Sequence, residues 1–124
     1  MPKNEPRFSW QSRFKSFVYA WEGLVQFLKT EHNARIHLVL TLLVIVLCFV
    51  FKITNSEAMA LVIVMALVWI TELLNTALEK AMDFISTEKH PQIKWVKDLA
   101  AGAVLVAAAT AVIVGCLVFI PKIF

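Results

Sequence analysis

Three long runs of apolar residues are the feature that most constrains this chain. One of them, residues 99–120, has 22 residues without a charge. The other two cover residues 38–51 and 58–70, and both continue into more polar sequence. A chain of 124 residues, 60% of them apolar, is one small domain that could not hide all three runs from water. We therefore expect a bilayer as its solvent, which excludes a soluble globular enzyme, a secreted disulfide scaffold and a disordered tail.

The apolar runs predict three membrane-spanning helices within a single membrane-embedded domain, residues 1–124. A helix rises about 1.5 Å per residue, so about 18 to 20 residues cross the hydrocarbon core. We place the spans at about residues 36–53, 58–79 and 99–120. The second helix is expected to continue to Asp83. A polar hairpin at residues 52–57 and a polar loop at about residues 86–97 connect the spans.

An amphipathic helix over residues 12–30 is expected to precede the spans. Its apolar residues recur at intervals of three and four, the period of one helical face. They are Phe14, Phe17, Val18, Trp21, Leu24, Val25 and Leu28. Polar and cationic residues largely fill the other face, which suits a helix lying in the membrane interface. The alternative is an ordinary helix packed on a protein core. The predicted fold class is thus all-α, with a surface helix and three transmembrane helices.

The distribution of cations predicts the orientation in the membrane. Of the twelve Lys and Arg residues, six precede the first span, one lies in the first hairpin, four lie between the second and third spans and one follows the third span. The positive-inside rule then puts the N-terminus and the second loop in the cytoplasm and the C-terminus outside. The net charge of +3 does not indicate nucleic acid, because no basic stripe interleaved with aromatic residues is present. The first ten residues, MPKNEPRFSW, lack the apolar segment of a cleaved signal peptide.

Several classes of site are excluded by what the sequence lacks. Cys48 and Cys116 lie inside apolar runs without metal-ligand spacing, so neither a zinc site nor a disulfide framework is expected. The chain has three glycines and no phosphate-binding glycine loop, which excludes a P-loop or protein-kinase fold.

A polar stripe on the second span is the strongest sign of chemistry. Glu72, Asn75, Glu79 and Asp83 fall within an arc of about 80° on one helical face and rise about 16 Å. Glu72 would then lie near the hydrocarbon boundary, where an acid costs about 2 to 3 kcal/mol to insert and generally faces a bundle interior or water-filled site. The alternative is a helix end that rises into water with a solvated acidic face.

The acids of this boundary could divide the work of catalysis. Glu72, partly desolvated, suits a general base, and Glu79 could hold Mg²⁺, which prefers oxygen ligands. One Glu is a poor magnesium site, so Glu31 could supply a second carboxylate, the alternative being a surface pair with Arg35. Lys97 could oppose developing negative charge on a phosphate, with Asp98 beside it to hold it in place or to accept a hydrogen bond from a ribose or an amine.

These residues carry a resemblance to a known family. The segment Glu-Leu-Leu-Asn-Thr-Ala-Leu-Glu-Lys-Ala-Met-Asp at 72–83, Lys-His-Pro at 89–91 and Lys-Asp-Leu-Ala-Ala-Gly-Ala-Val at 97–104 resemble the prokaryotic diacylglycerol kinases, which include the undecaprenol kinases. The resemblance covers roughly residues 12–120. It implies an ATP- and Mg²⁺-dependent enzyme that phosphorylates a lipid alcohol, working as a homotrimer with active sites shared between neighbouring chains.

The resemblance also implies roles for individual residues. Glu72 matches the catalytic base, and Glu31 and Glu79 match the metal-holding carboxylates. The positions that match contacts to the nucleotide are Tyr19, Glu31, Glu79, Glu88, Lys89, His90, Lys97 and Asp98. Asn75 and Asp83 match polar residues that support the site. Where the family usually has an arginine this chain has Ser12, with Arg13 next to it, and a shift of one residue turns a helical side chain by about 100°.

We thus expect a lipid kinase of the bacterial cytoplasmic (inner) membrane that transfers the γ-phosphoryl group of ATP to undecaprenol or diacylglycerol, in phospholipid metabolism. The form of residues 100–104 and the His90-Pro91 pair look closer to the undecaprenol kinase branch. The alternative is a non-catalytic, oligomeric channel subunit or scaffold. A pore predicts polar residues at mid-bilayer on more than one span, and the first and third spans carry almost none. His32 and His37 are expected to be interfacial polar residues.

Overall fold

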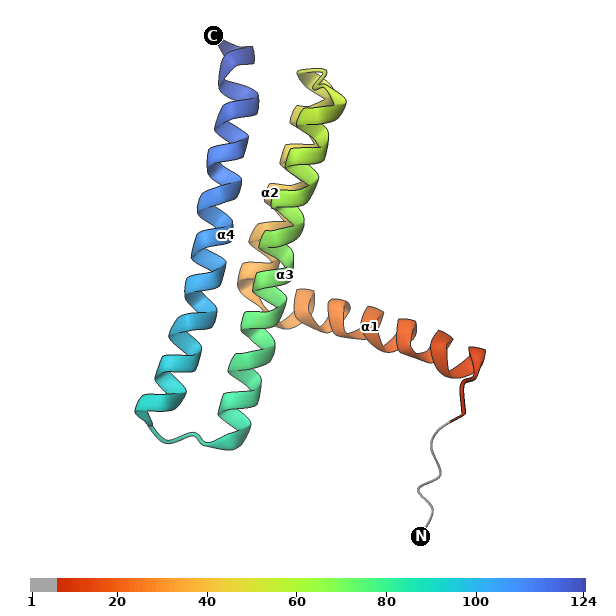
Figure 1. Ribbon diagram of the computed structural model, residues 1–124, viewed down its shortest axis with the longest axis vertical. Helices are drawn as coiled ribbons and strands as arrows, with labels where there is room; N and C mark the ends of the chain where they lie inside the picture. Colours follow the sequence, from red (N-terminus) through yellow and green to blue (C-terminus); the bar gives the residue numbers. More distant parts are fainter. Residues whose placement is uncertain (1–6) are drawn as a thin grey trace. The chain divides into compact units, whose positions relative to one another are not determined.

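The computed structural model describes residues 7–124, which form four helices and no strand. They are α1 (Trp10–Thr30), α2 (His32–Val50), α3 (Asn55–Ile85) and α4 (Pro91–Ile123), shown in Figure 1. Helices α2, α3 and α4 are long and apolar enough to cross a membrane, so the predicted all-α class with three spans is confirmed. Lys3, and most of the segment in which no signal peptide is expected, lie outside the described residues.

The chain divides into two units, the first ending at Arg35 and the second running from Ile36 to Phe124. In the first unit, Ser9 accepts a hydrogen bond from the Ser12 N–H at 2.9 Å and caps α1. This cap starts α1 two residues before the predicted boundary, because a serine hydroxyl satisfies a free N–H group of the first turn.

The other end of α1 is closed by an arginine from the following helix. Arg35 donates to the carbonyl of Leu28 at 3.1 Å and to that of Lys29, two of the carbonyls without an intrahelical partner. Along α1 the large side chains Phe14, Phe17 and Trp21 are exposed within the chain. These residues belong to the apolar face that the helical period predicts.

In the second unit, α2 ends at Val50, three residues before the predicted span boundary at residue 53. Lys52 has a φ of 48°, and the Ile53 N–H donates to the Cys48 carbonyl at 3.3 Å. This is the pattern of a Schellman motif, in which a left-handed residue ends the helix and the chain turns.

The start of α3 is set by a capping box. Thr54 accepts from the Glu57 N–H at 3.2 Å, and the Glu57 carboxylate accepts from the Thr54 N–H at 2.9 Å. Both bonds satisfy donors that would otherwise be free, so the helix begins at Asn55, before the predicted span at residue 58. It then continues to Ile85, past the expected end of the helix at Asp83.

Helix α4 begins within the expected loop over residues 86–97, so only the first five residues of that range form a loop. His90 is the N-cap, its Nδ1 accepting from the Gln92 N–H at 3.1 Å, and Pro91 occupies the first helical turn. Proline is favoured there because its φ suits a helix and its missing N–H needs no partner. Lys97 therefore stands on a helix and not in a loop.

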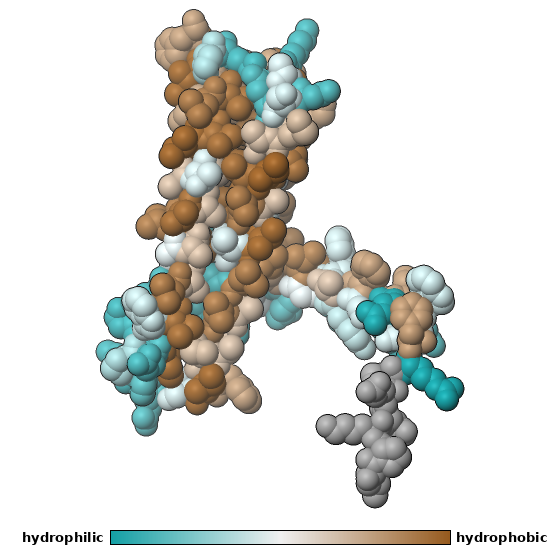
Figure 2. All heavy atoms as spheres, viewed as in Figure 1, coloured by the Kyte–Doolittle hydropathy of each residue, from teal (hydrophilic) through white to brown (hydrophobic). Residues whose placement is uncertain are grey.

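The lengths of α3 and α4 place their polar ends outside the hydrocarbon. With 31 and 33 residues they span about 46 and 50 Å, against about 30 Å for the hydrocarbon core. In the second unit, Figure 2 shows a hydrophobic belt with hydrophilic residues gathered at both ends. Counting about 20 residues from Asn55 puts Glu72 just inside the hydrocarbon and Asp83 beyond it.

Helices α3 and α4 pack on each other along their length (Figure 1). The buried residues of this pair include Val64 and Val68 from α3 and Ala100 and Ala107 from α4. Alanines at such positions let helix backbones approach closely, as membrane helices require. At the end of the unit where α3 begins, Lys122 forms an ion pair with Glu57 at 3.1 Å.

A hydrogen bond also links α2 to α3, and its loss should be measurable. Trp69 Nε1 donates to Thr41 Oγ1 at 2.9 Å. We expect Trp69→Phe to lower the free energy of unfolding in mixed detergent micelles by about 0.6 kcal/mol and at most about 1.7 kcal/mol, the average and the maximum for such bonds between membrane helices. The same change at Trp95, which is 60% exposed, is the control and should leave the unfolding curve unchanged. Equal effects of the two substitutions would contradict this role of Trp69.

Candidate active site

Glu72 on α3 is the one buried charged side chain among residues 7–124, with 5% of its surface exposed. Its Oε1 lies 2.8 Å from Nε2 of His37, which α2 supplies from 35 residues earlier in the chain. An isolated charge would be costly at this place, and a hydrogen-bonded partner reduces that cost. The predicted stripe is thus built around a carboxylate that faces the helix bundle and not water.

Two neighbours contact His37, one at its backbone and one at its ring. Thr41, one turn further along α2, donates to the His37 carbonyl at 2.7 Å. The Trp69 ring meets the imidazole edge to face, with ring centroids 6.5 Å apart. His37 and Thr41 are four residues apart and Trp69 and Glu72 three apart, so each pair shares one helical face. Two facing pairs of polar residues therefore join α2 to α3.

Asn75 and Glu79 continue the stripe toward the end of α3. The Asn75 Oδ1 atom is buried and has no hydrogen-bond partner within the described part of the chain. A buried amide oxygen is nearly always bonded, so this atom points to a water, a ligand or another chain at the site. Glu79, one turn further, is half-buried.

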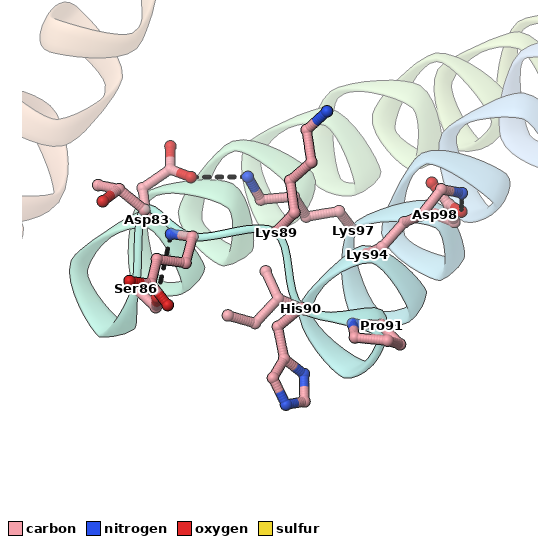
Figure 3. A pocket seen from close by; sticks show the side chains of 11 residues that line it. Asp83, Ser86, Lys89, His90, Pro91, Lys94, Lys97 and Asp98 are labelled. Atoms are coloured by element: carbon pink, nitrogen blue, oxygen red, sulfur yellow. Dashed lines mark hydrogen bonds and ion pairs between the residues drawn. The ribbon is translucent and has the colours of Figure 1, made fainter.

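Two ion pairs stand where α3 ends and α4 begins (Figure 3). Lys97 Nζ lies 2.6 Å from Asp83 Oδ1, and Lys94 pairs with Asp98 one turn along α4. Asp98 therefore does not hold Lys97, which was one of the two roles expected for it. Consecutive helical side chains point about 100° apart, so Lys97 faces α3 and Asp98 does not.

A pocket of about 590 Å³ opens between the ends of these two helices (Figure 3). Its lining residues are Asp83, Ser86, Thr87, Glu88, Lys89, His90, Pro91, Ile93, Lys94, Lys97 and Asp98. Five residues that follow Asp83 in the sequence are expected to contact the nucleotide, and all five line this pocket. His90 caps α4, and its ring extends away from the Asp83–Lys97 pair.

The remaining predicted residues belong to the first unit. Tyr19 is exposed on α1, and Glu31 is the residue at which α1 ends, its N–H donating to the Phe27 carbonyl at 2.9 Å. The Ser12 N–H is used in capping α1, and the Arg13 guanidinium stands over the Phe8 ring at 5.5 Å.

A second cavity, of about 380 Å³, lies between α2, α3 and α4. Its lining is apolar apart from His37 and Cys116, and it follows α2 to Leu47 and α4 from Ala108 to Ile120. We call it the apolar groove. His37 lines one end of the groove and also bonds the Glu72 carboxylate, so it links the two.

Two residues at the site were not expected there. His37 follows the charged start of α2, so its sequence context indicates only an interfacial residue. Its spacing of four from Thr41, the single polar residue of the run over residues 38–51, is the signal of a polar face turned toward another helix. Lys94 stands four residues before Asp98, the spacing of a helical ion pair, and becomes recognisable once α4 is known to include it.

Comparison with known proteins shows a consistent set of relatives. The family model described as prokaryotic diacylglycerol kinase matches residues 18–119. The chain is 38% identical over 110 residues to the undecaprenol kinase of Bacillus subtilis, covering 89% of each protein. It is 40% identical over 109 residues to the diacylglycerol kinase of a Synechocystis species, covering 87% of this chain and 62% of that protein. The diacylglycerol kinase of Escherichia coli is 33% identical over 103 residues, 83% of this chain and 84% of the relative.

Proposed function

This chain belongs to the prokaryotic diacylglycerol kinase family, and from that premise we propose that it transfers the γ-phosphoryl group of ATP to the hydroxyl of a membrane lipid alcohol. The observation that carries the proposal is Glu72, a buried carboxylate at the depth where a lipid headgroup meets the hydrocarbon. A base placed there can reach a hydroxyl that never leaves the membrane.

The apolar groove supports the lipid side of the reaction. Its lining suits a hydrocarbon chain, and His37 at one end of it bonds the Glu72 carboxylate, so an alcohol on that chain would be presented near Glu72. The groove spans about 15 Å along α2 from His37 to Leu47. We propose undecaprenol or diacylglycerol as the lipid, since relatives carry both names.

The pocket between the ends of α3 and α4 supports the nucleotide side. It gathers Lys89, Lys94 and Lys97 around a space outside the hydrocarbon, and lysine acts on phosphates as a point charge. The Asp83 carboxylate holds Lys97 from the facing helix. We propose that ATP places its phosphates here, with contributions from Tyr19, Glu31 and Glu79 as the family resemblance implies.

Oxygen donors on α3, in the turns before Asp83, fit Mg²⁺. Glu79 and the unbonded Asn75 Oδ1 share one face of α3, and oxygen atoms are the ligands this ion prefers. Mg²⁺ commonly keeps water and phosphate oxygens among its ligands, so one or two carboxylates are enough to hold it. Glu79 and Glu31 would hold it, and when bound it supplies positive charge against the phosphate oxygens.

Phosphoryl transfer is then mostly a matter of position and charge. The lipid hydroxyl gives its proton to Glu72 as its oxygen bonds to the γ-phosphorus. The bond from that phosphorus to the bridging oxygen breaks, and its electron pair leaves with ADP. Lys97, held by Asp83, opposes the negative charge that develops on the transferred group.

The assembly and placement in the membrane complete the proposal. We propose one membrane-embedded domain over residues 1–124, in the bacterial inner membrane, with the N-terminus and the α3–α4 loop in the cytoplasm. The count of Lys and Arg supports this orientation. Three apolar helices cannot enclose both a nucleotide and a lipid headgroup, which supports a homotrimer with shared sites. The exposed alanines of α4, such as Ala101 and Ala103, offer close approach to a neighbouring helix.

The proposal is tested by assaying both lipids side by side. Purified protein in mixed micelles receives Mg-ATP with undecaprenol, with diacylglycerol or with no lipid, and the extracted lipids are analysed for phosphorylated product. Phosphorylation of at least one lipid, absent without ATP, supports the proposal. If folded protein phosphorylates neither undecaprenol nor diacylglycerol, the proposal is overturned.

Lys97→Met should weaken use of ATP strongly. The substitution removes the charge that faces the phosphates and leaves Asp83 without its partner at the pocket. We expect kcat/KM for ATP to fall about 100-fold or more, as when one donor to a developing oxyanion is lost. The matched control is Lys52→Met, at the opposite end of the second unit. Equal kinetics of the two variants would show that Lys97 has no part in the reaction.

A further inference from the structure

We propose that His37 is a positioning residue for Glu72: it holds one carboxylate oxygen so that the other faces the lipid hydroxyl. This inference rests on the proposed function, since it takes Glu72 as the base. It adds a residue on another helix to the site and assigns it a specific bond.

The chemistry of the two groups fixes the direction of the hydrogen bond. An ionised carboxylate has no proton to donate, so the 2.8 Å contact requires that Nε2 of His37 carry the hydrogen and Oε1 of Glu72 accept it. The bond joins a residue of α3 that is 5% exposed to a side chain of α2. It also occupies Oε1, which leaves Oε2 to accept the hydroxyl proton.

The surroundings of His37 suit a fixed donor better than a mobile one. The imidazole is 20% exposed, with the Trp69 ring against it. Thr41 bonds both the His37 carbonyl and the Trp69 indole, which ties the backbone and the packing ring to each other. Such a second layer of contacts limits the orientations of the imidazole and, through it, of Glu72.

The apolar groove gives the position a functional reason. His37 is the polar residue at the end of its lining, so a lipid chain in the groove would bring its hydroxyl to the His37–Glu72 pair. During transfer the hydroxyl O–H bond breaks and its proton moves to Oε2, while the hydroxyl oxygen bonds to the γ-phosphorus of ATP. His37 keeps its own proton throughout, and Glu72 returns the acquired proton to water after the phosphorylated lipid leaves.

The experiment compares His37→Ala and His37→Gln, with His32→Ala as the control on the same helix, where the side chain is exposed. The Gln side chain can place an amide N–H near the position of Nε2 and keep the bond. We expect His37→Ala to lower kcat about 10- to 100-fold, the usual cost of losing a partner that orients a catalytic group. KM for ATP should change less than about twofold, and Gln should restore kcat to within about fivefold of the wild type.

A second measurement separates positioning from general damage to the fold. In a Glu72→Gln background His37→Ala should cause no further loss of kcat, because the two residues act as one unit. Full activity of His37→Ala, failure of Gln to restore activity, or independent losses in the double variant would each overturn the inference. In those cases the proposed function would still hold, provided that the wild type is active and Glu72→Gln is inactive. A wild type inactive on both lipids would instead refute the proposed function, and the inference with it.

Discussion

Glu72→Gln should nearly abolish lipid phosphorylation, with kcat falling about 1,000-fold or more. The amide keeps the shape of the side chain but cannot take the hydroxyl proton at this depth, where 5% of the residue is exposed and water is scarce. KM for ATP should remain close to the wild-type value, because the lysines of the nucleotide pocket are untouched. The measurement is steady-state kinetics in mixed micelles with saturating lipid.

The matched control for this substitution is Glu57→Gln on the same helix. Glu57 lies at the opposite end of α3 in the capping box, which a glutamine can also complete. That variant should keep near wild-type kcat even though its ion pair with Lys122 is lost. Full activity of Glu72→Gln would show that the base is another group and would contradict the proposed mechanism.

Removal of Mg²⁺ should abolish the activity, and Glu79→Gln should raise the Mg²⁺ concentration needed for half-maximal rate about tenfold or more. Loss of residues that merely support metal ligands costs about 10- to 100-fold in affinity, so loss of a direct carboxylate ligand should cost at least as much. Glu79 is half-buried on the face that carries the unbonded Asn75 oxygen, which leaves few other oxygens to replace it.

A titration with Mg²⁺ at fixed ATP, after treatment with a chelator, measures this effect. Glu57→Gln again serves as the control and should give the wild-type curve. An unchanged requirement for Mg²⁺ in Glu79→Gln, or full activity after chelation, would contradict the assigned role.

The helices could be predicted from sequence because each apolar run needs a bilayer and each bilayer crossing needs a helix. The ends of the helices could be predicted less accurately, because single capping hydrogen bonds set where each helix begins or ends. The Thr54 capping box and the His90 cap extend α3 and α4 beyond the apolar runs. Polar composition alone indicates a loop up to Lys97, yet Pro91 at the first turn starts a helix that carries Lys94 and Lys97.

In the candidate site, features within one helix could be predicted from sequence, whereas contacts between helices could not. The stripe from Glu72 to Asp83 follows from helical periodicity within one segment. The partner of Glu72 does not, since the contact with His37 depends on how α2 is rotated against α3. Likewise, the pairing of Lys97 with Asp83 joins two helices across a loop, and adjacency in sequence indicated a different partner.

Lipid phosphorylation by this protein can be followed through the γ-phosphoryl group itself. ATP labelled at the γ-phosphate is given to the purified wild type and to Glu72→Gln in micelles that contain the lipid alcohol, and label is counted in the extracted lipid. We expect Mg²⁺-dependent label in the lipid with the wild type and nearly none with Glu72→Gln. Release of labelled inorganic phosphate with no label in the lipid, or equal lipid labelling by the two proteins, would contradict this expectation.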